Sequence, residues 1–182
     1  MTLFRPATLL MVQYAHYHRD RRNIATHLVG IPLISLSIGV LLLSPAWSVA
    51  GQTLTLAWAM WALTSLWYLS RGDLLLGLAT SVVNGALIAA AHEVPPLAQA
   101  LGLAVWQAGF GLFLIGWVLQ FIGHYFEGRK PAFVDDLVGL LVGPMFVVME
   151  LLAAVGACRE LMARIEAEAG PTHLRDLTGT AA

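Results

Sequence analysis

Apolar residues are grouped along this chain into long runs, which short polar or proline- and glycine-containing segments separate. A helix crosses the hydrocarbon core of a bilayer with about 20 apolar residues, and roughly 17–25 are tolerated. The connecting segments SPAWSVAG, SRGD and HEVPP have the composition of turns between antiparallel helices. Four runs satisfy the length condition and predict spanning helices: residues 24–43, 52–69, 74–91 and 97–122.

Two further segments flank these runs. Residues 6–17 can form an amphipathic helix that lies in the membrane interface. A fifth apolar run, residues 133–158, has Asp135 and Asp136 near its start and Gly143-Pro144 in its middle. Proline removes a backbone hydrogen bond and clashes with the preceding turn, so we expect two half-helices there, either re-entrant or as a kinked span.

The predicted fold class is therefore all-α, a polytopic membrane helix bundle. It has four spanning helices, an N-terminal interfacial helix and a broken or re-entrant fifth segment. We expect one membrane domain over residues 1–160, followed by a polar C-terminal tail over residues 161–182.

Composition supports a membrane location. Of the 182 residues, 58% are hydrophobic and 12% are charged, whereas a soluble domain has about 25% charged residues. Much of the surface is thus expected to face a lipid bilayer. A net charge of −1 and the lack of a long basic run give no indication of nucleic-acid binding, and a single cysteine excludes an internal disulfide.

The basic residues predict the orientation. Those that flank the four runs lie on one side of the predicted bundle, which the positive-inside rule makes cytoplasmic. A complete fifth crossing would carry the arginines of the tail outside, which favours a re-entrant segment. The composition, rich in arginine, alanine and leucine, suggests a bacterial inner membrane, or the endoplasmic reticulum if the chain is eukaryotic. The flanking basic residues are Arg5, Arg19, Arg21, Arg22, Arg71, Arg129 and Lys130.

Four histidines share the cytoplasmic end of this predicted bundle. His27 opens the first run, His124 closes the fourth, and His16 and His18 precede the first. Glu127 follows His124 by three residues. Histidine is at home at membrane interfaces without any further role, but four from distant parts of the chain at one depth indicate a site.

Helical geometry leaves the ligand set open. In one continuous helix, His16, Asn23 and His27 fall within a narrow arc, and His18 points away from His27. If the helix breaks near residues 20–23, with Asn23 as its cap, His18 can approach His27. The sequence permits either arrangement. On the fourth run, one helix face carries Gln120, His124 and Glu127.

Histidines and a carboxylate that converge from separate helices suit a metal ion. Imidazole binds iron, zinc and copper, and two histidines plus a carboxylate with open positions are typical of non-haem Fe(II) oxygenases. This spacing is not a self-sufficient signature. The residues alone thus predict a metal site at the cytoplasmic face without choosing the metal.

Two segments of the chain resemble a known family. YHRDRRNIATHLVGIP, residues 17–32, and WVLQFIGHYFEGRKPAF, residues 117–133, are similar to its two signature blocks. This family of membrane proteins is typified by the yeast protein that metabolises phytosphingosine to odd-numbered fatty acids, an Fe(II)-dependent 2-hydroxy-fatty-acid dioxygenase. The resemblance covers most of the chain, from the N-terminal helix to the fifth run.

The resemblance implies Fe(2+), O2 and a long-chain 2-hydroxy fatty acid, which fatty acid alpha-oxidation converts to CO2 and an acid one carbon shorter. It favours His18 over His16, and so the broken helix. The implied metal ligands are His18, His27 and His124, completed by His16 or Glu127. Further catalytic candidates are Asn23 and Glu127. Candidates for substrate binding are Arg22, Lys130 and Gln120, although the two basic residues also fit a purely topological role.

Two alternatives replace this enzyme, and a third keeps the enzyme but changes its metal centre. A transporter would usually place ionisable residues inside its spans, and the interiors of the four runs have none. A non-catalytic membrane protein leaves the clustered histidines unexplained. A di-iron centre is suggested by His124 and Glu127, which reverse the Glu-x-x-His pair of helix-bundle sites, but too few carboxylates accompany them.

Overall fold

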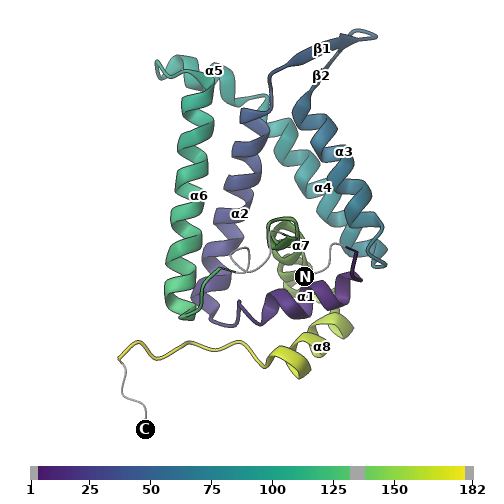
Figure 1. The fold of residues 1–182 in the computed structure, drawn as a ribbon, viewed down its shortest axis with the longest axis vertical. Coiled ribbons are helices and arrows are strands. Elements are labelled where there is room, and N and C mark those ends of the chain that lie inside the picture. The colour runs from purple at the N-terminus through teal and green to yellow at the C-terminus, as the bar shows by residue number, and fades with distance from the viewer. Residues whose placement is uncertain (1–3, 132–137, 179–182) are drawn as a thin grey trace.

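The computed structural model describes residues 4–131 and 138–178. Helices dominate it, and one short hairpin interrupts them (Figure 1). The elements are α1 (Ala7–Ala15), α2 (Arg21–Leu41), β1 (Ala46–Val49), β2 (Gln52–Thr55), α3 (Leu56–Leu69), α4 (Leu74–Ala91), α5 (Val94–Ala100), α6 (Val105–Glu127), α7 (Val138–Ala154) and α8 (Arg159–Ala169).

Two helix pairs form the long part of the molecule. α2 packs along α6, and α3 packs along α4 (Figure 1). The α2–α6 contact is close because glycines face each other: a Cβ built on Gly30 would lie 2.9 Å from the carbonyl oxygen of Gly116, and one on Gly116 would lie 2.9 Å from that of Gly30. This seam fixes the distance between the two helices that carry His27 and His124.

The structure is mostly helical, as predicted, and adds one short hairpin that the all-α prediction did not contain. β1 and β2 pair antiparallel around Ala50 and Gly51, which have φ of 50° and 78°. Two consecutive residues with positive φ match the right-handed twist of a tight hairpin. The hairpin takes residues 52–55 from the predicted second run, so α3 keeps only 14 residues.

Within residues 4–131 and 138–178, three helical stretches are long and apolar enough to cross a membrane, or four if a bent pair is counted as one span. The long apolar helical stretches are Arg21–Leu41, Leu74–Ala100 and Val105–Glu127, and the bent pair is α7 with α8. The predicted fourth run, residues 97–122, is divided between α5 and α6 around Gly102, which has φ of 70°. α6 continues to Glu127 and ends at Gly128 in the left-handed conformation, so His124 and Glu127 belong to its last turns.

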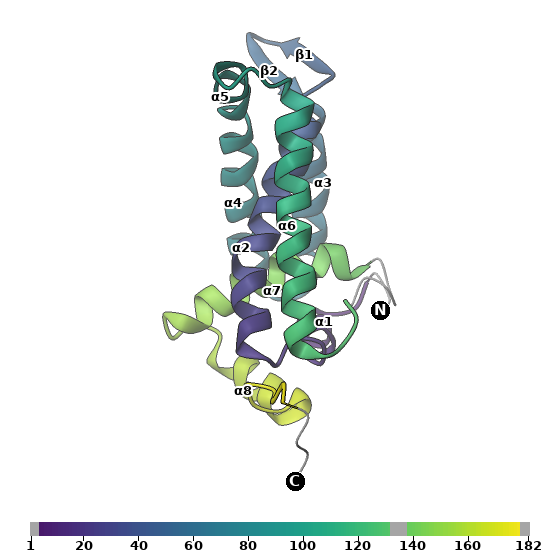
Figure 2. The same ribbon diagram turned by 90° about the vertical axis from the view of Figure 1, so that its left-hand side faces the viewer.

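The predicted break at Gly143-Pro144 is wrong. α7 runs through Pro144, and packing explains why: Gly139, Val142, Gly143, Met145 and Phe146 are all buried around the proline. The chain instead bends by 115° between α7 and α8, where Gly156 and Cys158 have positive φ. Figure 2 shows α7 lying across the long axes of α2 and α6. Asp135 and Asp136 fall outside the described residues.

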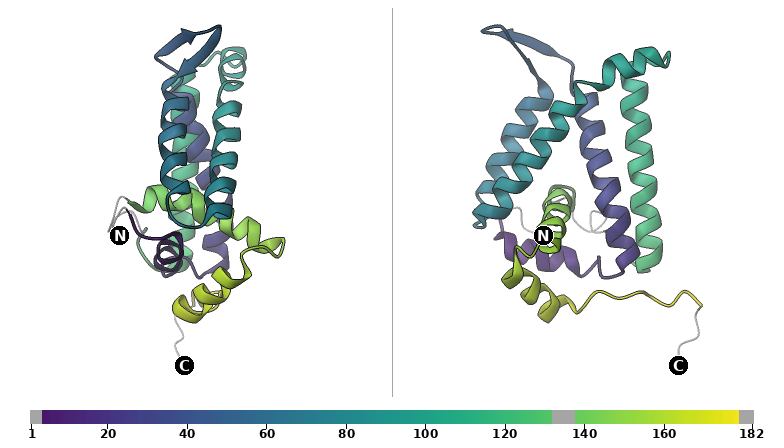
Figure 3. Two further views of the ribbon diagram at one scale, coloured as in Figure 1. Left: turned by 90° about the vertical axis from the view of Figure 1, so that its right-hand side faces the viewer. Right: turned by 180° about the vertical axis from the view of Figure 1, so that it is seen from behind.

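A helix, α1, is found where the interfacial helix was predicted, and most of its residues are buried inside the protein. Leu10, Met11 and Tyr14 join a core with Phe146 and Met149 of α7, and α8 covers the other side of α1. Beyond α8, residues 170–178 form an extended segment, here called the strap, which passes below the ends of α2 and α6 (Figure 3).

Candidate metal centre

The loop between α1 and α2 carries His18 into the interior. α1 ends at Ala15 and α2 begins at Arg21, with Asp20 as its N-cap: the carboxylate accepts a hydrogen bond of 2.8 Å from the backbone N–H of Arg22. The helix therefore breaks, as the second alternative required. The predicted cap at Asn23 is wrong because the break lies three residues earlier, at a residue that is also a strong N-cap former.

Three histidines from three parts of the chain meet at this point. His18, His27 and His124 are buried, and each offers a nitrogen within 4.8 Å of those of the other two. The Nε2 atoms of His18 and His27 are 3.0 Å apart. The ring of His124 stands edge-on to both, with centroid distances of 4.9 Å to His18 and 5.0 Å to His27.

Backbone carbonyls fix which nitrogens face inward. Nδ1 of His18 lies 2.8 Å from the carbonyl oxygen of Tyr14, and Nδ1 of His27 lies 2.9 Å from that of Asn23. A carbonyl oxygen only accepts, so both Nδ1 atoms carry the proton and both Nε2 atoms present lone pairs. Two lone pairs 3.0 Å apart repel each other unless a cation lies between or beside them.

A proton could play that part, but burial opposes it. The pKa of His18 is lowered well below its ordinary value, first by burial and then by the neighbouring His27 and His124. The neutral form that results is the form that binds metals. Nδ1–H groups that are held by carbonyls are also the usual support of metal-binding imidazoles. The donor set therefore fits a metal ion.

Glu127 anchors the loop that carries His18. Its carboxylate accepts hydrogen bonds from the backbone N–H groups of Arg19, at 2.9 Å, and Asp20, at 2.8 Å. The side chain of Asn23 donates to the same carboxylate, at 2.9 Å. The negative charge also lies at the positive end of the α2 dipole. Glu127 and Asn23 thus tie the loop and α2 to the last turn of α6, one turn from His124.

The strap holds the same loop from below. His173 forms a short parallel bridge to Asp20: its N–H donates to the carbonyl of Arg19, and its carbonyl accepts from the N–H of Arg21, both at 2.9 Å. The N–H of Arg175 donates to Asp20, at 2.8 Å. Asp20 also pairs with the guanidinium of Arg22, at 2.7 Å, and this partner lowers the pKa of the Asp20 carboxyl.

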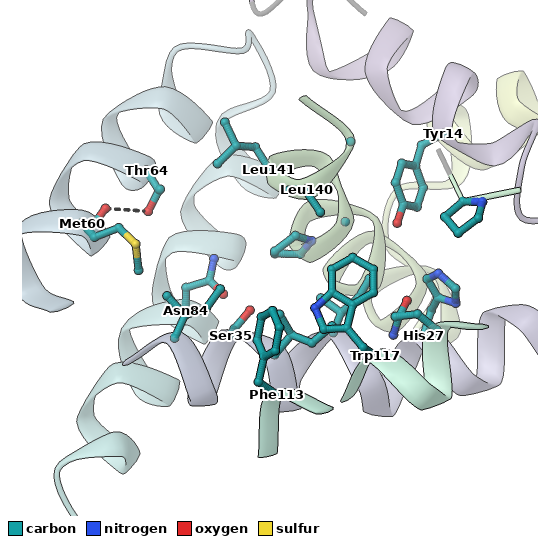
Figure 4. A pocket seen from close by; sticks show the side chains of 18 of the residues that line it. Tyr14, His27, Ser35, Met60, Thr64, Asn84, Phe113, Trp117, Leu140 and Leu141 are labelled. Carbon is teal, nitrogen blue, oxygen red and sulfur yellow. Dashed lines mark hydrogen bonds between the residues drawn. The ribbon is translucent and has the colours of Figure 1, made fainter. Parts of the chain in front are cut away.

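A cavity of about 260 Å³ opens from the histidines into the bundle (Figure 4). His27, His124 and Gln120 line one end, and Figure 4 places Trp117 near His27. Apolar side chains of α2, α3, α4, α6 and α7 form most of the remaining wall, among them Ile31, Ile34, Ile38, Met60, Ile88, Phe113 and Leu141. The volume is close to the lower limit of about 300–1,000 Å³ for small-molecule sites.

Comparison with known proteins decides the family. A family model described as "2-hydroxy-palmitic acid dioxygenase Mpo1-like" matches residues 4–155. The chain belongs to the Mpo1-like family. A Saccharomyces cerevisiae relative named 2-hydroxy-palmitic acid dioxygenase MPO1 is 33% identical over 159 residues, which are 84% of this chain and 83% of the relative. No solved structure matches the chain.

Membership of the Mpo1-like family confirms the resemblance of the two sequence blocks. The apolar helices and the relationship to this family of dioxygenases together fit an integral membrane protein. The family match ends at residue 155, ahead of α8 and the strap.

The remaining candidate residues of this Mpo1-like chain lie around the centre in different ways. His16 is exposed at the end of α1 and lies outside the histidine group. Arg22 is engaged by Asp20 and stacks over Phe126. Lys130 is exposed in the loop after α6. Gln120 is buried beside His27 and His124.

Tyr14 is a site residue that the sequence did not single out. Its ring stacks on His18, with centroids 4.1 Å apart and planes 3° from parallel, while its carbonyl fixes the His18 tautomer. It also lines the cavity, and its hydroxyl points toward Gly143 of α7. The sequence feature that could have indicated Tyr14 is its position four residues before His18. This spacing indicates a contact only when α1 is known to end at Ala15, between the two residues.

Proposed function

We propose that this protein is a membrane-embedded, Fe(II)-dependent dioxygenase that acts on long-chain 2-hydroxy fatty acids. The reaction would consume one O2 for each 2-hydroxy acid and yield CO2, water and an acid one carbon shorter. The observation that carries the proposal is the pair of facing lone pairs on His18 and His27, completed by His124, in a family whose yeast member is named a 2-hydroxy-palmitic acid dioxygenase.

Iron held by His18, His27 and His124 would supply the activation of O2. A set of three neutral imidazoles leaves positions open for other ligands, as an oxygenase requires. Glu127 holds the loop and, in this assignment, is a positioning residue that is not itself a ligand. A single iron is favoured over two because both carboxylate oxygens of Glu127 are already engaged by Arg19, Asp20 and Asn23.

Gln120 is assigned to the polar head of the substrate. Its Nε2 is buried and has no hydrogen-bond partner within the described parts of the chain. An unpaired buried donor is costly, whereas a carboxylate or hydroxyl oxygen of the substrate would satisfy it. Gln120 lines the cavity together with His27 and His124, so that contact would hold the head beside the metal.

We assign the basic residues a role in the orientation of the bundle in the membrane. The loop after α6, the turn between α3 and α4, and the start of α2 carry arginines at one end of the bundle, which we take as the cytoplasmic face of a bacterial inner membrane. Arg22 and Lys130 lie at this face, where their positive charges would attract an anionic substrate electrostatically without forming a specific hydrogen bond to it.

Metal analysis and oxygen uptake test the proposed function together. Anaerobically purified protein should contain about one iron per chain and consume O2 with 2-hydroxypalmitate. Palmitate lacks the second oxygen of the head group and should be inert or a weak inhibitor. Equal turnover of both acids, or undiminished turnover after the iron is removed, would contradict the proposal.

A further inference from the structure

The cavity beside the histidines has a defined direction. Figure 4 shows His27 and Trp117 toward one end, and Met60, Thr64 and Asn84 toward the other. The first group belongs to α2 and α6, and the second to α3 and α4. The cavity therefore leads from the metal ligands across the bundle to the α3–α4 pair.

Two hydroxyl groups that α3 contributes to the wall are satisfied by the protein itself. The Thr64 hydroxyl donates to the carbonyls of Met60, at 3.0 Å, and Trp61, at 3.1 Å. The Tyr68 hydroxyl donates to the carbonyl of Leu141, at 3.0 Å. Because backbone carbonyls already engage these hydroxyls, and because most of the lining side chains are apolar, the cavity suits a hydrocarbon.

Close helix packing ends the space beyond Ile38. A Cβ built on Gly39 would lie 2.9 Å from Ile88 and 3.0 Å from Ala91 of α4. On the other side, a Cβ on Gly109 of α6 would lie 2.9 Å from Leu41. An occupant that enters from the histidines cannot continue past these contacts along α2.

We propose that this cavity binds the acyl chain of the substrate, with the carboxyl end at Gln120 and the histidines and the methyl end toward Met60 and Thr64. The α3 wall then limits the chain length that the protein accepts. This inference rests on the proposed function for the nature of the head group. The chain itself is indicated by the apolar wall and by its continuity with the metal ligands.

A series of 2-hydroxy acids gives the first expectation. Burial of each methylene raises affinity about fourfold, as long as the cavity has room for it. Affinity should therefore climb from 2-hydroxyoctanoate toward longer acids and then reach a plateau where the chain meets α3. A chain that only partitions into the bilayer would show no such plateau.

Two neighbouring substitutions on α3 test the wall. Thr64→Phe adds bulk inside the cavity and leaves no partner unsatisfied, because its hydroxyl binds only its own helix in the described contacts. Leu63→Phe is the matched control, since Leu63 is 69% exposed on the outside of the same helix. We expect Thr64→Phe to raise KM for 2-hydroxypalmitate at least tenfold and KM for 2-hydroxyoctanoate much less, whereas Leu63→Phe should change neither KM. An unchanged chain-length profile would overturn the proposal.

The direction of the chain is tested by quenching of tryptophan fluorescence. Trp61 adjoins Met60 on α3, whereas Trp117 lies near His27. In nanodiscs, 2-hydroxypalmitate that is brominated at its methyl end should quench the tryptophan fluorescence of the unsubstituted protein, and most of this quenching should be lost in the Trp61→Phe variant. For the acid that is brominated near its carboxyl, most of the quenching should be lost in the Trp117→Phe variant. Unbrominated acid should restore the fluorescence by competition.

These outcomes separate the two proposals. Saturable, position-dependent quenching without turnover would support the acyl-chain site and contradict the proposed dioxygenase function. Turnover of 2-hydroxypalmitate could instead be accompanied by quenching that unbrominated acid does not reverse, or that depends on Trp61 and Trp117 in the opposite way. Either result would contradict the acyl-chain site and support the dioxygenase function.

Discussion

The Nε2 atoms of His18 and His27 face each other at 3.0 Å, and both carry lone pairs because their Nδ1 atoms are held by backbone carbonyls. His18 comes from a loop and His27 from the second turn of α2, so the contact exists only because the chain breaks between α1 and α2. A third imidazole, that of His124, completes the group from α6. The facing lone pairs on the two Nε2 atoms repel each other, and a bound cation would remove this repulsion. The first prediction rests on this effect.

Replacement of a ligand should abolish metal binding. His18→Ala, His27→Ala and His124→Ala should each lower metal affinity by more than about 100-fold, since loss of a supporting contact alone typically costs 10–100-fold. Metal content after dialysis against a chelator measures the loss. His92→Ala is the matched control, because its Nδ1 binds the carbonyl of Ile88 at the other end of α4. Full metal content in the His27→Ala variant would contradict the proposed metal site.

Glu127→Gln should weaken the site without removing a ligand. The carboxylate accepts from two backbone N–H groups, those of Arg19 and Asp20, and a neutral amide offers them a weaker acceptor and adds a donor. We expect about 10–100-fold lower metal affinity and about 1–3 kcal/mol lower stability. The absorption spectrum of bound Co(II) should keep its shape, since the three imidazoles remain.

Glu93→Gln is the control for this change. Glu93 is exposed at the start of α5, at the opposite end of the bundle, so its neutralisation should affect neither affinity nor stability. A Co(II) spectrum that changes in Glu127→Gln as it does in His124→Ala would instead make Glu127 a ligand.

Removal of the strap should loosen the His18 loop. Deletion of residues 170–182 takes away the hydrogen bonds that His173 and Arg175 make with residues 19–21, each worth about 0.5–1.5 kcal/mol. We expect faster release of metal to a chelator and a lower melting temperature. Deletion of residues 179–182 alone should leave both unchanged. An identical release rate for the two truncated chains would show that the strap does not support the site.

The orientation of the bundle remains a prediction and has a direct test. The hairpin that carries Ser48 lies at one end of the molecule, and the turn after α3 that carries Ser70 lies at the other (Figure 1). With Cys158→Ala as the background, Ser70→Cys should be labelled from the cytoplasm and Ser48→Cys from the opposite side. Labelling of both from one side would refute the predicted topology.

The sequence predicted the long helices because they depend on local composition. A run of apolar residues has one stable state in a bilayer, and α2, α4 and α6 follow from it. The choice of His18 over His16 depended on the break before α2, which the family resemblance favoured and periodicity left open.

The errors arose where tertiary packing overrides local preference. Pro144 breaks an isolated helix, but buried neighbours hold α7 together on either side of it. The hairpin depends on positive φ at Ala50, a residue that rarely adopts it, so neither its strands nor the shortening of α3 could be expected. Two of the partners of Glu127 are backbone groups more than 100 positions away in sequence, and the residue pattern does not reveal such contacts.

The glycine seam between α2 and α6 joins the first of the three long apolar stretches to be synthesised to the third. His18 and His27 leave the ribosome well before His124, and α3, α4 and α5 are synthesised in between. The three histidines can therefore meet only after α6 has been made and has docked on α2. In the proposed metal assignment, acquisition of metal would require α6, and chains arrested before His124 should be made without it.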